Sequence, residues 1–187
     1  MIASIGRVLA AAGYSLLVLG RSTIAEELQY KNARVVHNVL SEDAIASLAD
    51  QVSNNRFLRG DRDGTNRQYG KANVPVDVLQ RILQSIDDEC TVHEPTKLRS
   101  TLITGDTAPH KDRKAETGGD FGNIVDVMFV FLDSNPGAYF QIGEDKIPAT
   151  AGTLISFEGH GVVHNTIVPS RTEVRLLGPI ASRETFR

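Results

Sequence analysis

The chain has 187 residues, of which 41% are hydrophobic and one is a cysteine, and its formal net charge is -3. Its length and composition indicate one soluble globular domain with a sizeable core, and the lone cysteine excludes an intramolecular disulfide or thiolate cluster and fits an intracellular, cytoplasmic protein. The acidic balance argues against broad electrostatic binding to nucleic acid.

The first 25 residues differ in character from the rest of the chain. They contain Arg7 and Arg21, no acidic residue, and an apolar run at 8–19 that is too short to span a bilayer. This pattern fits an apolar signal-peptide core or an acid-poor transit peptide, and it also fits a first helix or strand packed on the domain. We expect residues 1–32 to form an N-terminal extension, with a targeting role left open, and residues 33–187 to form the domain.

Two amphipathic helices are expected after a first strand. Residues 33–39 alternate and are rich in β-branched side chains, which is typical of a strand. Ser41 is a good N-cap for a helix whose apolar residues recur at helical spacing. Pro75 suits the first turn of a second helix that ends near Asp88. Because each helix is apolar on one face only, both are expected to pack on the same sheet.

Two polar segments are expected to be loops. Residues 54–71 have no hydrophobic period, and residues 113–123 are rich in glycine. Each could be solvated surface or could cover a site on the domain. Four residues in these loops or on the strand predicted at 97–104 are candidate substrate contacts: Arg67, Tyr69, Arg99 and Arg113.

Further strands are expected in the second half of the chain. Residues 97–104 lead to a polar segment, and residues 124–132 are nearly all apolar or β-branched, as in a central strand. A turn containing Pro136 and Gly137 connects the latter to a strand at 138–142.

A candidate metal site follows the strand at 97–104, where the chain reads LITGDTAPHKD. His110 and Asp112 are two positions apart, so on an extended segment their side chains point to the same side. With His164 they make a set of two histidines and one carboxylate, which leaves three octahedral positions open on Fe(II). Eleven residues beyond His164, the guanidinium of Arg175 could pair with the far carboxylate of a bidentate 2-oxo acid.

His160 is a competing choice for the second histidine, because Arg171 lies eleven residues beyond it. Two glycines flank His160 and would fix it poorly, whereas His164 begins a β-branched run. Arg171 falls in a turn, and Arg175 falls inside a predicted strand at 173–177. We therefore expect His164 and Arg175 to be the functional pair.

The order of these residues resembles the Fe(II)/2-oxoglutarate-dependent oxygenases: His-x-Asp, about fifty residues, His, about ten residues, Arg. The stretches VMFVFLDSNPGAYFQIG and IPATAGTLISF resemble the middle strands of that family, and ARVVHNVLSEDAIASLADQV resembles its opening strand and helix. The resemblance extends over roughly residues 33 to 180.

The resemblance implies a mainly β fold with packing helices, the double-stranded β-helix or jelly roll. It implies Fe(II) bound by His110, Asp112 and His164, with 2-oxoglutarate and O2 as cosubstrates and Arg175 on the distal carboxylate. The implied reaction hydroxylates or otherwise oxidises a small-molecule or peptidyl substrate, as in prolyl hydroxylases, and releases succinate and CO2.

Two other functions are weighed against this one. The branch that demethylates nucleic acids carries a second arginine six positions after the cosubstrate arginine, where this chain has Ala181. A cupin-like barrel with another metal, or without catalysis, would act as a binding module, but the His-x-His pair of cupins is missing.

Overall fold

The computed structural model describes residues 26–54, 66–86, 91–111, 126–159 and 161–181. These residues form two antiparallel sheets and two helices. In chain order, the elements are β1 (Glu26–Gln29), β2 (Arg34–His37), α1 (Glu42–Asn54), β3 (Arg67–Val74), α2 (Val76–Gln84), β4 (Thr96–Ile103), β5 (Asp126–Phe131), β6 (Tyr139–Ile142), β7 (Asp145–Pro148), β8 (Leu154–Glu158), β9 (His164–Ile167) and β10 (Val174–Ala181).

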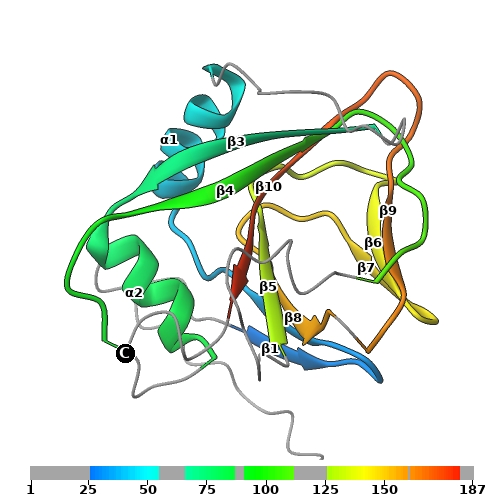
Figure 1. Ribbon diagram of the computed structural model, residues 1–187, viewed down its shortest axis with the longest axis horizontal. Helices are drawn as coiled ribbons and strands as arrows, with labels where there is room; N and C mark the ends of the chain where they lie inside the picture. Colours follow the sequence, from blue (N-terminus) through cyan, green and yellow to red (C-terminus); the bar gives the residue numbers. More distant parts are fainter. Residues whose placement is uncertain (1–25, 55–65, 87–90, 112–125, 160, 182–187) are drawn as a thin grey trace, which may run out of the picture.

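The seven-stranded sheet has the order β1-β2-β8-β5-β10-β4-β3, and the three-stranded sheet has the order β7-β6-β9. Both helices lie on one side of the large sheet, and β6, β7 and β9 lie on its other side (Figure 1). The expectation of a mainly β protein with two packing helices is confirmed. The large sheet is therefore covered on both faces, so its central strands must be apolar on both faces.

β5 shows how one strand supplies two cores. Val127, Phe129 and Phe131 belong to the cluster between the two sheets, and the alternate residues Met128 and Val130 belong to the cluster under the helices. Period-two alternation sends successive side chains to opposite faces, which explains why this stretch is apolar without interruption.

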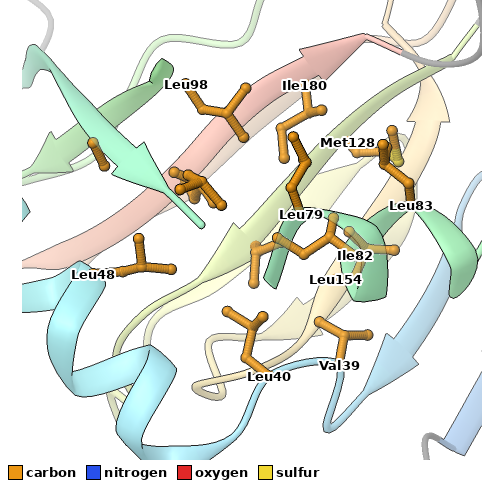
Figure 2. Close-up of a cluster of buried hydrophobic side chains, with 14 of the residues drawn as sticks. Val39, Leu40, Leu48, Leu79, Ile82, Leu83, Leu98, Met128, Leu154 and Ile180 are labelled. Carbon is orange, nitrogen blue, oxygen red and sulfur yellow. The ribbon is translucent and has the colours of Figure 1, made fainter. Parts of the chain in front are cut away.

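The helix-side core fixes α1 and α2 on the large sheet. Leu48 of α1 and Leu79, Ile82 and Leu83 of α2 point toward Leu154 and other strand residues in Figure 2. Leu79 and Ile82 are completely buried, and each such side chain contributes about 1.5–3 kcal/mol of transfer free energy. The packing of these apolar faces holds the sheet from behind.

Most predicted elements are confirmed, with boundaries moved by a few residues. The Ser41 hydroxyl accepts a hydrogen bond from the amide of Ala44 at 3.3 Å, as expected of the residue before α1. Pro75 precedes α2, which ends at Gln84, short of the predicted end near Asp88. His164 begins β9, as predicted.

β3 corrects the prediction of a loop over residues 54–71. Its eight residues pair with β4 without a break, from Arg67 opposite Ile103 to Val74 opposite Thr96. β3 is at the edge of the sheet and buries only Ala72 and Val74, so its first half carries no apolar alternation to reveal it. Residues 55–65 of that predicted loop lie outside the described residues.

The N-terminal prediction is only partly within the described residues. Residues 26–29, which fall in the expected extension, form β1 and pair with β2, while residues 1–25 lie outside the described part. Within the described ranges, no helix is long and apolar enough to cross a membrane.

Candidate functional site

Two histidines far apart in the sequence lie side by side. His110 follows β4, and His164 is the first residue of β9; their backbones pair, with N···O distances of 3.0 and 2.8 Å. The centres of the imidazole rings are 4.4 Å apart. The structure therefore brings together two of the three predicted metal ligands.

The segment before His110 is held along β9 by several hydrogen bonds. The Thr107 amide donates to the carbonyl of Thr166, and the Thr166 amide donates to the Thr107 hydroxyl at 2.8 Å. The Asp106 carboxylate accepts from the amide of Val168, and the Asn66 side-chain amide donates to the carbonyl of Asp106. These bonds fix the register that places His110 opposite His164. They also hold the backbone of His110 in place, and a metal ligand needs such a rigid support.

In each of the two imidazoles, Nδ1 lies close to a backbone carbonyl. His110 Nδ1 lies 2.9 Å from the carbonyl oxygen of Ala108, and His164 Nδ1 lies 3.2 Å from that of Val162. A carbonyl can only accept, so these two bonds favour a proton on Nδ1, although in His110 the Nη2 of Arg67, which can only donate, also lies 3.3 Å from Nδ1. Metal-binding histidines usually make this kind of bond with their other nitrogen.

Aromatic rings surround His164, which is 1% exposed. The centre of its imidazole ring lies 5.7 Å from the centre of the Phe140 ring, in a stacked arrangement, and 4.7 Å from the centre of the Phe157 ring, in an edge-on arrangement. Phe129 contacts both phenylalanines. One side of His164 is therefore apolar.

Three residues of the sequence prediction lie outside the described part: Asp112, Arg113 and the competing His160. Lys111 is the last described residue before Asp112. Within the described ranges, no other His, Cys, Asp or Glu completes a group of three potential metal ligands with the two histidines.

A cavity of about 40 Å³ lies between the two sheets beside the histidines. β3 and β4 supply a polar wall, and apolar residues of β5, β6 and β10 supply much of the rest. The lining residues are Arg67, Tyr69, Arg99, Thr101, Ile103, Thr107, His110, Phe129, Phe140, His164, Thr166, Leu176 and Pro179. Three of the four predicted substrate contacts, Arg67, Tyr69 and Arg99, are thus on this wall.

The polar wall runs outward from the histidines in a row. Arg67 Nη1 lies 3.1 Å from His110 Nε2 and 3.5 Å from the Tyr69 hydroxyl, and the guanidinium carbon of Arg99 lies 5.3 Å from the centre of the Tyr69 ring. Among the residues that the structure describes, none forms a hydrogen bond with the buried Nε of Arg67. Positive charge is therefore concentrated on one side of the cavity.

Arg175 does not face this cavity. Its backbone amide and Nη1 each donate to the carboxylate of Asp133 at 2.8 Å, and Nη2 pairs with Glu173. Its neighbour Leu176 lines the cavity, so strand alternation directs Arg175 to the opposite face of the sheet. The structure therefore does not bring Arg175 to this cavity, although the sequence analysis expected it to pair with the far carboxylate of a 2-oxo acid bound at the histidines.

Several lining residues were absent from the sequence prediction. Thr107 and Thr166 connect the two histidine segments, and Phe129 and Phe140 form the apolar side. Because side chains alternate along the strand predicted at 124–132, the sequence could have placed Phe129 on the same face as every second residue of that strand. Nothing in the sequence indicated that this face belongs to the histidine side of the sheet.

The sequence itself matches no protein-family model and no curated protein. The structure is similar to that of a prolyl-4-hydroxylase from Pseudomonas putida, with 13% identity, a TM-score of 0.55, and coverage of 78% of this chain and 89% of that one. It is also similar to the non-heme alpha-ketoglutarate-dependent epimerase SnoN from nogalamycin biosynthesis, with 16% identity, a TM-score of 0.55, and coverage of 78% and 76%. These similarities confirm the fold class, which is the double-stranded β-helix or jelly roll.

Proposed function

We propose that this chain is an Fe(II)- and 2-oxoglutarate-dependent dioxygenase. It would hydroxylate or otherwise oxidise a small-molecule or peptidyl substrate and release succinate and CO2. The observation that carries the proposal is the pairing of His110 with His164 beside a cavity between the two sheets. The fold shared with a prolyl-4-hydroxylase and with an alpha-ketoglutarate-dependent epimerase supports it as an analogy.

The types of residue suit an Fe(II) ion. Both histidines have Nδ1 within hydrogen-bond distance of a backbone carbonyl, so Nε2 would be the atom that binds the metal. Asp112 would supply the carboxylate, since it follows His110 by two positions and an extended segment would direct both side chains to one side. Two imidazoles and one carboxylate are the donor set that suits non-heme Fe(II).

Arg67 imposes one condition on metal binding. Its Nη1 lies 3.1 Å from His110 Nε2 and its Nη2 lies 3.3 Å from His110 Nδ1, so the guanidinium lies against the ring nitrogen that the metal would need. The guanidinium must therefore rotate away from His110 when a cation binds, because two positive charges cannot share that nitrogen. The partly buried Arg67 side chain would then be directed along the cavity wall.

The chain would contribute positioning and the exclusion of water. Bound Fe(II) would activate O2 at the expense of the oxidative decarboxylation of 2-oxoglutarate. The carbonyls of Ala108 and Val162 fix the orientation of the two imidazoles. Phe129, Phe140 and Phe157 keep water from one side of His164, which strengthens electrostatic interactions there and limits side reactions.

The proposal is tested by succinate formation and by metal titration. The protein should form succinate from 2-oxoglutarate with Fe(II) above a metal-free control, and it should bind about one Mn(II) as a surrogate. His110→Ala and His164→Ala should each lower Mn(II) affinity by about 10-fold or more, whereas His160→Ala should change it little. Unchanged affinity in both folded variants would remove the proposed site, and one bound metal without succinate would favour a cupin-like binding module.

A further inference from the structure

Two arginines from neighbouring strands project into one cavity. β3 and β4 pair so that Tyr69 is opposite Thr101 and Lys71 is opposite Arg99. Arg67 and Tyr69 are two positions apart on β3, and Arg99 and Thr101 are two positions apart on β4, so all four side chains share a face. The same four residues line the cavity.

These two arginines differ from other partly buried arginines in their partners. Arg34 pairs with Glu27, and Arg175 pairs with Asp133 and Glu173. Among the residues that the structure describes, Arg67 contacts His110 and Tyr69, and Arg99 stacks on Tyr69; neither meets a carboxylate. A guanidinium is always charged, and its burial without a counter-charge is costly, so the wall favours an anionic ligand.

The row of contacts divides the wall into a near and a far position. Arg67 reaches the imidazole of His110, whereas Arg99 lies on the far side of Tyr69. Same-face positions on a strand are about 7 Å apart, which is comparable to the length of an extended five-carbon diacid. A 2-oxo acid whose keto end is at the histidines would thus direct its second carboxylate toward Tyr69 and Arg99.

We infer that Tyr69 and Arg99 form the binding site for the distal carboxylate of a 2-oxo dicarboxylic acid, and that Arg175 has no part in it. The inference rests on the proposed function, because the keto end of the acid is assigned to the histidine pair. Arg99 supplies charge and two parallel N–H donors, and the Tyr69 hydroxyl supplies a further donor. The site therefore selects a dicarboxylate over a monocarboxylate of similar length.

The test compares two acids that differ in the distal carboxylate. 2-Oxoglutarate and 2-oxobutanoate are titrated by calorimetry into Mn(II)-loaded parent protein, Arg99→Met and Arg175→Met. Arg99→Met should weaken 2-oxoglutarate binding by about 30-fold or more, because a charge-assisted pair to a desolvated carboxylate is lost. Binding of 2-oxobutanoate should be the same in the parent and in Arg99→Met, and Arg175→Met should bind both acids as the parent does.

Two further variants separate a contact from a general effect of charge or folding. Lys71→Met removes a cation that is opposite Arg99 in register but is not in the cavity lining, so it should leave both affinities nearly unchanged. Tyr69→Phe keeps the ring under Arg99 but removes the hydroxyl. It should weaken the binding of 2-oxoglutarate by several-fold and leave the binding of 2-oxobutanoate unchanged. Circular dichroism checks each fold, and Arg99→Gln replaces Arg99→Met if the latter does not fold.

The outcomes distinguish the inference from the proposed function. If Arg175→Met no longer binds 2-oxoglutarate while Arg99→Met and Tyr69→Phe bind it as tightly as the parent does, the inference is overturned and the proposed function stands. If Mn(II)-loaded parent protein binds neither acid, the proposed function fails and the inference fails with it. If Arg99→Met lowers the affinity for 2-oxoglutarate and for 2-oxobutanoate equally, the arginine contacts the keto end that the two acids share, and the inference is also overturned.

Discussion

At the residue scale, the role of an arginine depends on the face of the strand that carries it. Arg175 has the spacing from His164 that the sequence analysis favours, yet its side chain pairs with Asp133 behind the cavity lining. Spacing in sequence does not determine facing, because a shift of one residue in register sends every side chain to the other face. For Arg99, the sequence predicts the strand that carries it but does not determine which face of the sheet its side chain is on, and the structure shows that it lines the cavity.

Arg175 is therefore expected to matter for stability more than for ligand binding. The side chains of Arg175 and Asp133 are 23% and 20% exposed, and Asp133 also accepts from the Arg175 amide. Arg175→Met should lower the free energy of unfolding by about 1–3 kcal/mol, because a partly buried carboxylate loses its charged donor. Urea unfolding followed by circular dichroism measures this change.

A matched control comes from a pair on the surface. Lys31 and Glu144 are 73% and 86% exposed, and solvent screens their attraction. Lys31→Met should thus change the free energy of unfolding by less than about 0.5 kcal/mol. Equal effects of the two substitutions would mean that the Arg175 pair is no stronger than a surface contact.

At the element scale, apolar pattern decided what the sequence could predict. α1, α2 and β5 each bury a periodic set of side chains, so the hydrophobic pattern revealed them. β3 is an edge strand whose inward side chains at its first half are Arg67 and Tyr69, which line a cavity instead of a core. The residues that make β3 interesting for function are thus the same residues that hide it from a search for alternating apolar residues.

The separation of the two cores leads to a prediction about α2. Leu79 is completely buried in the helix-side cluster, which lies across the large sheet from the cavity. Leu79→Ala should destabilise the protein by about 2–5 kcal/mol through lost burial and a residual void. It should leave the affinity for Mn(II) and 2-oxo acids unchanged under conditions where the variant is folded.

Gln84→Ala is the control on the same helix. Gln84 is exposed at the last residue of α2, and alanine is a good helix former, so stability should change little. Thermal unfolding and calorimetric titration of both variants measure the two properties. A large loss of ligand affinity in folded Leu79→Ala would contradict the independence of the two sides of the sheet.

At the scale of the whole molecule, the two histidines connect the two sheets. His110 follows β4 of the large sheet, and His164 begins β9 of the small sheet. The sequence predicted the barrel class and this pair of histidines, but long-range pairing of strands carries no local signal. The bonds of Thr107 to Thr166 and of Asp106 to Val168, which set the relative position of these segments, therefore appeared only in the structure.

A metal ion bound to both histidines should stabilise the entire fold, because the unfolded chain does not hold the two imidazoles together. A ligand that binds only the folded state adds about 2.7 kcal/mol at a free concentration 100 times its Kd. For a chain of this length, that corresponds to a rise in Tm of about 5–10 °C. Mn(II) should produce this rise in the parent protein and little rise in His164→Ala, as measured by differential scanning calorimetry.

Because the keto end of the acid is assigned to the metal, 2-oxoglutarate should raise Tm further with Mn(II) present and very little without it. A rise caused by 2-oxoglutarate alone, equal with and without Mn(II), would mean that the acid binds the arginine wall independently of the histidines and that the two ends of the cavity do not form one site.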